Sequence, residues 1–405
     1  MAIGSREVTN HTSQLPTRTQ VAIIGGGPAG TLLSYLLHLE GVASVVLELR
    51  SREHVLGRVR AGVIEYGSAG VLRAAGLGDR MDGEGFVHDG VNLAFANKLL
   101  RIDFGGLVGK HVVIYGQTQL QKDLYDAMDR EGIALVDEAE QIEVHDIETT
   151  TPRVIFDKDG ESHSLSCDYV VGCDGAHGTA REYIPSTVSQ TFERLYPFVW
   201  VGLLSETPPV NDELIYANHL DGFALCSMRN ENLSRYYVQG SAEDTPEDWP
   251  DERFWEALER RLPTEAADRL VTGPSIEKLV TPLRSWVSEP LSYGRLYLAG
   301  DAAHVVPPTG AKGLNLAISD VVYLASALSD FYTTGSTTGL DEYSATALSR
   351  VWKAVRFSWW LTALMHRFSA EEDFDRRLQM AELDYLFSSE AAQRAMAENY
   401  VGLLL

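Results

Sequence analysis

The most informative segment for the fold is Val21-Ala22-Ile23-Ile24-Gly25-Gly26-Gly27-Pro28-Ala29-Gly30. Its four apolar residues predict a short strand buried on both faces, and Thr31 to Glu40 then predicts a helix ended by Gly41. Between them, Gly25, Gly27 and Gly30 form a GxGxxG turn, in which backbone without side chains can approach a pyrophosphate at the helix N-terminus. The apolar run Val45 to Leu47 predicts a second buried strand, which ends at Glu48, where a carboxylate can hydrogen-bond ribose hydroxyls. Together these features predict a dinucleotide-binding βαβ unit, although the turn alone does not separate FAD from NAD.

Two later strand-and-turn segments bear on which nucleotide is bound. The apolar strand Tyr169 to Gly172 ends in Cys173-Asp174-Gly175, which by itself is an ordinary strand end. The strand Arg295 to Ala299 leads to Asp301, whose carboxylate can accept hydrogen bonds from the sugar-alcohol chain of a flavin. A helix over Gly313 to Leu328 would direct its positive end, near Lys312, at the flavin ring, where it favours the anionic reduced form. Asp301 alone fits a structural turn cap equally well, but the three motifs in this order favour FAD over NAD.

The centre of the chain changes character. Short aromatic and β-branched runs alternate with turn residues and predict an antiparallel sheet from strands at 198–204, 214–217, 223–228 and 235–239. Helical spacing returns at Asp251 to Arg261 and at Glu342 to Phe368. The fold class is therefore α/β (α+β overall), with a Rossmann-like FAD-binding domain, an antiparallel-sheet substrate domain and a C-terminal helical region. The expected ranges are 1–18 for a flexible N-terminal arm, 19–178 for the FAD-binding domain, 179–293 for the substrate sheet, and 294–405 for a flavin-contacting loop plus a helical interface region.

The composition limits which binding partners and which cellular compartment are expected. The net charge is −23, from 34 basic and 57 acidic side chains, which disfavours binding to nucleic acid or to anionic lipid. The three cysteines form no CxxC pair, and we expect buried free thiols in a reducing compartment and no metal site. Because there is no apolar signal region and no run of about 18 apolar residues, we expect a cytoplasmic enzyme without a membrane span.

The cofactor motifs, in this order, resemble those of the flavoprotein aromatic hydroxylases. Further segments narrow the resemblance to the branch of that family that hydroxylates 4-hydroxybenzoate, above all Tyr216-Ala217-Asn218-His219, Pro307-Pro308-Thr309-Gly310-Ala311-Lys312-Gly313 and Glu398-Asn399-Tyr400-Val401-Gly402. Segments 56–63, 115–118, 222–227, 234–239 and 356–360 agree, so that the resemblance runs from about Thr19 to Gly402. It implies a homodimeric enzyme that uses FAD, NADH or NADPH, and O2. The reaction converts 4-hydroxybenzoate into 3,4-dihydroxybenzoate through a C4a-hydroperoxyflavin.

The resemblance also implies a site for the substrate carboxylate. An arginine suits a carboxylate because its guanidinium offers a planar bidentate fork, and Ser227 shares a strand face with Arg229. Tyr237 follows the next turn, on what is expected to be the partner strand. Taken alone, an arginine in a sheet is more often a solvated surface charge, so the assignment of Ser227, Arg229 and Tyr237 depends on the resemblance.

The phenol end of the substrate needs a route for its proton, because an ordinary phenol has a pKa of about 10 and the phenolate is the reactive form. The resemblance implies that Tyr216 accepts the proton, Tyr400 passes it on and His88 releases it to solvent. It also implies that the Pro308 carbonyl lies near the reacting hydroxyl. Isolated tyrosines are usually core or interface residues, and the sequence by itself does not connect these positions.

The remaining implied residues contact the cofactors. The expected cofactor-binding residues are Gly25, Gly27, Gly30, Glu48, Arg58, Arg60, Gln117, Asp174, Arg235, Asp301, Lys312, Gly313, Leu314 and Asn315. The resemblance implies that Arg235 lets the flavin move between a buried and an exposed position. Arg58, His177 and Arg284 match positions that contact the nicotinamide cofactor.

Several assignments stay open. Leu49 and His54 depart from the pattern of strict NADPH users, while Arg50 and Arg52 can still bind a phosphate, so NADH and NADPH are equally open. The substrate could instead be a related benzoate, such as 4-aminobenzoate or 3,4-dihydroxybenzoate. The chain could also be a non-catalytic flavin sensor or a plain NAD-dependent dehydrogenase. The tryptophans around Trp359 fit a helix core or a subunit interface.

Overall fold

The computed structural model describes residues 15–57, 62–368 and 373–403. Its first layer is a six-stranded sheet in the order β18-β19-β12-β1-β2-β8. These strands are β18 (Ser292–Tyr293), β19 (Leu296–Leu298), β12 (Tyr169–Gly172), β1 (Val21–Ile24), β2 (Ser44–Leu47) and β8 (Ala134–Val136). The strands from β19 to β8 run parallel, and β1 lies at the centre with all four residues buried. The Rossmann-like arrangement predicted from the first βαβ unit is confirmed.

Three helices pack with this sheet. They are α1 (Pro28–Leu39), α6 (Gln117–Glu131) and α9 (Gly313–Thr334), with α1 in contact with both of the others. Gly41 follows α1 with φ of +75°, the left-handed conformation that a helix C-terminal glycine adopts. The helix α9 is long and apolar enough to cross a membrane, with a mean hydropathy of 1.2, but 61% of that stretch is buried inside the protein. It is packed as a core helix between α1 and α10 (Thr338–Met365).

The second layer is an eight-stranded sheet in the order β20-β17-β13-β16-β15-β14-β5-β6. Its strands are β20 (His304–Val305), β17 (Ser275–Glu289), β13 (Gln190–Ser205), β16 (Leu233–Ser241), β15 (Gly222–Asn230), β14 (Ile215–His219), β5 (Gly90–Phe95) and β6 (Lys98–Asp103). All neighbours are antiparallel except β14 and β5. The predicted strands are therefore present, but the sheet also takes β5, β6 and β20 from outside residues 179–293.

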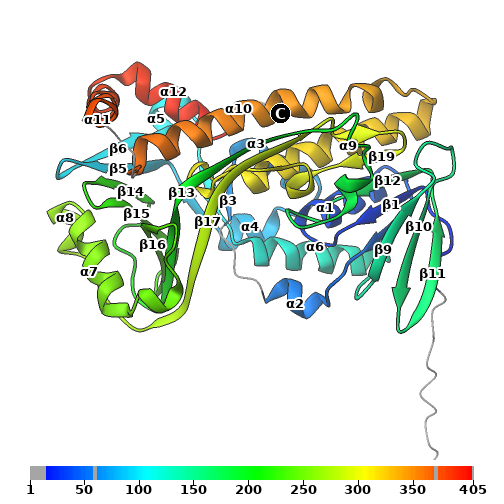
Figure 1. Ribbon diagram of the computed structural model, residues 1–405, viewed down its shortest axis with the longest axis horizontal. Helices are drawn as coiled ribbons and strands as arrows, with labels where there is room; N and C mark the ends of the chain where they lie inside the picture. Colours follow the sequence, from blue (N-terminus) through cyan, green and yellow to red (C-terminus); the bar gives the residue numbers. More distant parts are fainter. Residues whose placement is uncertain (1–14, 58–61, 369–372, 404–405) are drawn as a thin grey trace, which may run out of the picture.

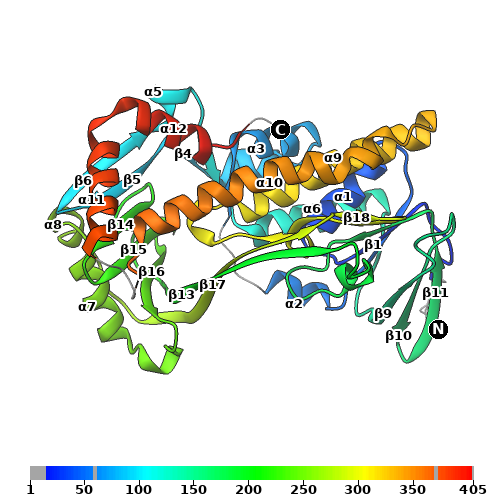
Figure 2. The same ribbon diagram turned by 45° about the horizontal axis from the view of Figure 1, so that its top comes forward.

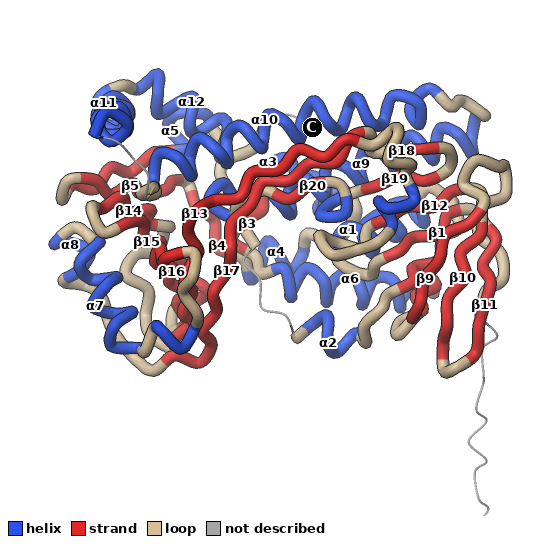
Figure 3. Tube along the Cα trace, viewed as in Figure 1, coloured by secondary structure: helices blue, strands red, loops and turns tan. Residues whose placement is uncertain are grey.

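Three long elements join the two layers. Figure 3 shows β13 and β17 extending side by side from the substrate sheet toward the Rossmann-like sheet, and Figure 2 shows α10 running along the molecule above them. The helices α11 (Asp373–Ser388) and α12 (Glu390–Tyr400) lie at the end nearest the substrate sheet (Figure 1). The prediction of helices at 251–261, 313–328 and 342–368 is confirmed by α7 (Asp251–Arg261), α9 and α10. The 15-residue β17 was not predicted, whereas α11 and α12 lie in the predicted C-terminal helical region, although their bounds were not predicted.

The remaining elements are short or peripheral. A three-stranded sheet comprises β9 (Glu140–His145), β10 (Arg153–Lys158) and β11 (Glu161–Ser166), and another comprises β3 (Val63–Ile64), β7 (Val112–Ile114) and β4 (Phe86–His88). The short helices are α2 (Arg52–Leu56), α3 (Tyr66–Ala74), α4 (Asp79–Glu84), α5 (Phe104–Val108), α8 (Thr264–Ala267), η1 (Ala180–Tyr183), η2 (Pro246–Asp248), η3 (Gly300–Ala302) and η4 (Pro308–Gly310). All three cysteines are free and buried, as expected.

The last residues of the expected N-terminal arm contact the Rossmann-like layer. Leu15 packs against the core of the Rossmann-like layer, and Thr17 O accepts a hydrogen bond of 3.0 Å from Ser166 N. Arg18 forms an ion pair with Asp168. Residues 15–18 are thus held against the domain, in contrast to the expected flexible arm, while residues 1–14 lie outside the described residues.

Candidate active site

The glycine turn after β1 has the geometry of a pyrophosphate cradle. Gly25 has φ of +106°, and a Cβ there would collide with the carbonyl of Cys173 on the β12 side. A Cβ at Gly30 would collide with the carbonyl of Gly25, whereas one at Gly27 would meet none of the described atoms within 4 Å. Two glycines therefore close the turn, and Gly27 leaves open space before the N-terminus of α1. Within the described residues no side chain caps that terminus, so its N–H groups are available to an anion.

The side chains around this turn hold it rigid. Glu48 Oε2 accepts from Gly26 N at 2.6 Å, and its Oε1 accepts from Arg50 N at 2.8 Å. The Gly26 carbonyl accepts from Gln121 Nε2 and from the Tyr125 hydroxyl, both at 3.1 Å. Glu48 thus lies beside the turn, and its contact with a ribose stays a prediction. Gln121 and Tyr125 were missed because α6 was not predicted, although Gln121 and Tyr125 four residues apart would share one face of such a helix.

The second and third motifs follow two neighbouring parallel strands, β12 and β19. Asp174 Oδ2 accepts from Ala180 N at 2.8 Å, so this carboxylate caps η1, while its buried Oδ1 has no partner among the described residues. Burial raises the pKa of Asp174. Asp301 lies in η3, the turn that β19 delivers, and Gly300 N donates to Asp320 Oδ2 at 2.9 Å. The same oxygen is 2.6 Å from His304 Nε2.

The pair His304 and Asp320 fixes the loop that carries Asp301. Both side chains are at most 1% exposed. Burial would lower the pKa of His304, but the adjacent Asp320 carboxylate outweighs it and the pKa is raised. A charged, hydrogen-bonded pair in the protein interior holds its two elements tightly, because either partner alone would be a buried uncompensated charge.

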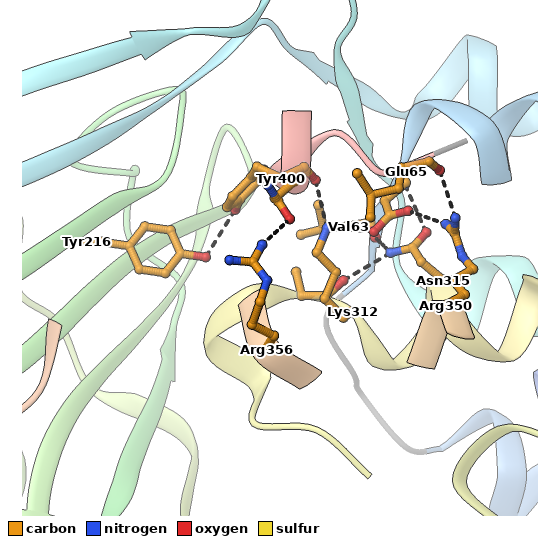
Figure 4. Close-up of polar contacts among 11 residues, drawn as sticks. Val63, Glu65, Tyr216, Lys312, Asn315, Arg350, Arg356 and Tyr400 are labelled. Atoms are coloured by element: carbon orange, nitrogen blue, oxygen red, sulfur yellow. Dashed lines mark hydrogen bonds and ion pairs between the residues drawn. The ribbon is translucent and has the colours of Figure 1, made fainter. Parts of the chain in front are cut away.

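Another buried charge cluster lies at the N-terminus of α9 (Figure 4). Lys312 Nζ donates to Glu65 Oε1 at 2.6 Å and to the Tyr400 carbonyl at 3.0 Å. Arg350 pairs with the other oxygen of Glu65 at 3.1 Å, and Asn315 Oδ1 accepts from Glu65 N at 2.9 Å. Burial lowers the pKa of Lys312. Glu65 and Arg350 were missed, because their partners are far away in the sequence.

The remaining predicted cofactor residues fall into three groups. Gln117 begins α6, and Leu314 is half-buried in the first turn of α9. Arg284 donates to Ala176 O at 3.4 Å, which brings it next to the exposed His177. Arg58 and Arg60 lie outside the described residues.

These features fit FAD. Gly27 and Gly313 face open space where a Cβ would meet no described atom, and the N-termini of α1 and α9 have no side-chain cap from the described part of the chain. The buried Asp174 Oδ1 offers an acceptor position that no described residue occupies. Phosphate groups and a flavin ring need this combination of open backbone, unpaired N–H groups and acceptors. Among residues 15–57, 62–368 and 373–403, no group of three or more histidines, cysteines, aspartates or glutamates could hold a metal ion.

The substrate sheet presents its predicted residues in rows, because directly opposed residues of neighbouring strands project from the same face. One row crosses four strands as Glu277, Leu204, Arg235 and Ser227. The adjacent row on that face is Gly202, Tyr237, Leu225 and Tyr216. A Cβ at Gly202 would lie 2.8 Å from the Tyr237 ring, so only glycine leaves room for that ring.

The end of these rows near Arg229 is cationic. Arg235 donates from Nε to the Tyr237 hydroxyl at 3.3 Å and pairs with Glu277 at 2.9 Å. Burial lowers the pKa of Arg229, and the hydroxyl of Tyr237 partly counteracts this effect. The buried Nε of Arg229 has no hydrogen-bond partner in the part of the chain that the structure describes. The structure therefore places Ser227 and Tyr237 in adjacent rows of one sheet face, with Tyr237 close to Arg229, and adds Glu277, which sequence reasoning missed.

At the Tyr216 end, two tyrosines form a buried hydroxyl pair. The Tyr216 and Tyr400 oxygens are 3.0 Å apart, and Tyr216 also donates to the Thr309 carbonyl at 3.1 Å. Burial raises the pKa of Tyr216 to about 12, and burial also raises the pKa of Tyr400 well above its usual value. Pro308 begins the same turn, η4, but its neighbour Thr309 supplies the carbonyl that contacts Tyr216.

Among the described residues, no hydrogen bond joins His88 to this pair. His88 is 3% exposed, and its Nδ1 has no hydrogen-bond partner within the described part of the chain. Burial lowers the pKa of His88. The structure brings Tyr216 and Tyr400 together, as predicted, while a proton route to His88 stays a prediction.

Comparison with known proteins agrees with this geometry. The family model described as FAD binding domain matches residues 18–358. The p-hydroxybenzoate hydroxylase of Acinetobacter baylyi is 50% identical over 387 residues, which are 95% of this chain and 96% of that protein. The kynurenine 3-monooxygenase of Salinispora tropica is 28% identical over 348 residues, covering 77% of this chain and 73% of that protein.

Among solved structures, the p-nitrophenol 4-monooxygenase of Pseudomonas putida superposes with a TM-score of 0.80 at 20% identity. The match covers 96% of this chain and 100% of that chain. At this identity the likeness establishes the shared fold of the two layers and the C-terminal helices.

Proposed function

This chain belongs to the FAD-binding family of flavoprotein aromatic hydroxylases, and from that premise we propose that it converts 4-hydroxybenzoate into 3,4-dihydroxybenzoate. It is an FAD-dependent aromatic hydroxylase. The co-substrates are O2 and NADH or NADPH. The observation that carries the substrate assignment is the pair of adjacent rows on one sheet face, with guanidinium groups at one end and a tyrosine pair at the other. A ring with a carboxylate opposite a phenol matches both ends.

The carboxylate binds Arg229 through the guanidinium fork, with Ser227 and Tyr237 as further donors. Arg229 is half-buried, and its buried Nε, which has no partner among the described residues, is costly unless an anion neutralises it. The lowered pKa of Arg229 has burial as its main cause, which supports the need for such an anion. This requirement favours aromatic acids over neutral phenols.

The phenol lies against Tyr216. Because burial raises the pKa of both tyrosines, neither serves as a permanent base. As Tyr216 accepts the substrate proton, its own proton turns from the Thr309 carbonyl to Tyr400, and the substrate becomes the more nucleophilic phenolate. His88, kept neutral by a lowered pKa, is a suitable final acceptor. The carbonyls of Pro308 and Thr309 orient the reacting hydroxyl.

Bound FAD supplies the reducing equivalents taken from the nicotinamide and the activation of O2. The glycine turn, Glu48, Gln117, Asp174 and Asp301 hold its nucleotide and sugar-alcohol parts, and Lys312 to Asn315 hold the ring edge, with Arg58, Arg60 and Arg235 as further contacts. The buried surroundings of this segment, where Lys312 is 4% and Asn315 is 1% exposed, keep water away from the reacting atoms.

Arg58, His177 and Arg284 are the proposed nicotinamide contacts. Arg52 bonds both oxygens of Asp129 at 2.8 Å and lies over the Tyr125 ring, which leaves Arg50 as the freer cation after β2. Because Arg52 is already paired, it is less able to bind the additional phosphate of NADPH, which supports use of NADH as well as NADPH.

We also propose a cytoplasmic homodimer. Exposed apolar side chains gather where α10 meets β13: Trp352 is 38% exposed and contacts Phe192, and Trp359 is 42% exposed. Sedimentation of the holoenzyme tests the dimer, and a monomer at micromolar concentration would refute it.

The test of function is NADH and NADPH oxidation by the FAD-loaded enzyme, with and without 4-hydroxybenzoate, with products separated by chromatography. Strong stimulation with formation of 3,4-dihydroxybenzoate supports the proposal. Hydroxylation of 4-aminobenzoate or 3,4-dihydroxybenzoate in preference would assign a related substrate. Absence of stimulation by any of these acids would indicate a non-catalytic flavoprotein.

A further inference from the structure

A buried polar stripe lies on one face of α10 and just beyond its end. Ser358, Thr362 and His366 are spaced by four residues, which places them on one side of the helix, and each is 0% exposed. Their neighbours Phe357 and Leu361 are apolar core residues. A buried polar side chain destabilises the protein unless it makes a hydrogen bond. The Ser358 hydroxyl has no partner among the described residues, so the partners of Thr362 and His366 indicate what the stripe does.

The middle residue, Thr362, contacts the turn beside the tyrosine pair. Its Oγ1 is 2.9 Å from Thr309 Oγ1 and 2.7 Å from the Ser358 carbonyl. The single hydroxyl proton of Thr362 is shared between these two acceptors, the Thr309 hydroxyl oxygen and the Ser358 carbonyl. The backbone carbonyl of Thr309 in turn accepts from Tyr216 at 3.1 Å. Thr362 is therefore one residue removed from the Tyr216 hydroxyl.

The two outer residues hold the ends of the stripe. A Cβ at Gly310 would lie 3.2 Å from Ser358 Cα, so α10 packs directly on the turn η4. His366 Nε2 accepts from Trp200 Nε1 at 2.7 Å, and Nδ1 lies 2.9 Å from the Thr362 carbonyl, to which it donates. Burial lowers the pKa of His366 to about 3, so the ring is neutral and its tautomer is set by these two bonds.

A chain of ring contacts also connects His366 of this stripe to Tyr216. The His366 ring stacks on Phe223 with centroids 4.2 Å apart, and Phe223 lies 6.1 Å from the Tyr216 ring. The polar stripe therefore contacts Tyr216 indirectly in two ways. His366 reaches its ring through Phe223, and Thr362 reaches its hydroxyl through Thr309.

We propose that this polar stripe positions the turn η4 against Tyr216, and that the Thr362 hydroxyl is the positioning group that sets the direction of the Thr309 carbonyl. The inference rests on the proposed function, in which Tyr216 handles the substrate phenol. A valine in place of Thr362 would fill the same volume among the apolar neighbours. The hydroxyl is therefore needed for the orientation of the Thr309 turn and not for packing.

Thr362→Val in the holoenzyme tests this role, with Thr362→Ser as the conservative variant. The matched control is Thr207→Val, at a buried threonine beyond β13 whose hydroxyl has no hydrogen-bond partner among the described residues. We expect Thr362→Val to lower kcat about three- to tenfold, the size of one net hydrogen bond, with KM within about twofold. The pKa of bound 4-hydroxybenzoate, measured from phenolate absorbance against pH, should rise. Thr362→Ser and Thr207→Val should match the wild type.

Unchanged kcat and unchanged bound-phenol pKa in Thr362→Val, even with a lower Tm, would overturn the inference. If that variant does not fold, Thr309→Val removes the same bond from the other side and is judged by the same readouts. If the wild type binds no phenolic acid, the proposed function fails. The crystal structure of Thr362→Val then decides the inference: a lost Tyr216 to Thr309 hydrogen bond supports it, and an unchanged 3.1 Å contact overturns it.

Discussion

Replacing Arg229 with lysine tests the carboxylate end of the site. Lysine keeps the positive charge but presents a single ammonium group in place of a planar fork. A hydrogen bond to a charged group contributes about 1.5–3 kcal/mol, and the substitution removes roughly one of two such bonds. Since about 1.4 kcal/mol corresponds to a tenfold change in an equilibrium constant, the Kd for 4-hydroxybenzoate should increase roughly ten- to a hundredfold.

The assay is titration of the FAD-loaded enzyme with ligand, followed by flavin absorbance. A neutral analogue, 4-hydroxybenzamide, supplies the internal control, because it offers the same ring and phenol without the carboxylate charge. Its Kd should change much less than that of 4-hydroxybenzoate. Equal losses for both ligands would mean that the pocket was distorted, and an unaltered affinity for the acid would refute the carboxylate assignment.

Three further perturbations probe the phenol end, the sheet and the Asp301 loop. Tyr216→Phe breaks the hydroxyl pair with Tyr400, so kcat should fall by about a hundredfold and the pKa of the bound phenol should rise in an absorbance titration; normal turnover would exclude the proton route. Gly202→Ala places a Cβ 2.8 Å from the Tyr237 ring, and this overpacking should cost about 1–3 kcal/mol of unfolding free energy in urea denaturation, whereas wild-type stability would show that the ring moves freely. Asp320→Asn leaves His304 without its buried counter-charge and should destabilise the protein by about 3 kcal/mol. Because the pKa of His304 is raised on folding, the pair stabilises the wild type fully below the unfolded histidine pKa, and that contribution is lost as pH rises through the folded pKa. Urea midpoints measured from about pH 6 to about pH 9 should show this decline in the wild type and not in Asp320→Asn; parallel curves would contradict it.

The sequence by itself determined the local elements and the cofactor class. The glycine turn, its flanking strand and helix, and Glu48 are adjacent in the chain, so their chemistry can be read from spacing alone. The same holds for α7, whose bounds were predicted from its helical spacing, and for the strands β14 to β16 with their turn residues. The resemblance of short segments then supplied the substrate class and the residue roles.

Which distant side chains meet depends on the packing of the whole chain. Tyr216 and Tyr400 are separated by 184 residues, and Lys312 and Glu65 by 247, so no periodicity relates them. Likewise, Thr309 meets Thr362 only because α10 packs across η4, and Arg235 meets Glu277 only because β13 lies between their strands. Local sequence patterns report backbone conformation and burial, whereas long-range contacts depend on strand order and helix packing, which arise from the collective burial of apolar faces.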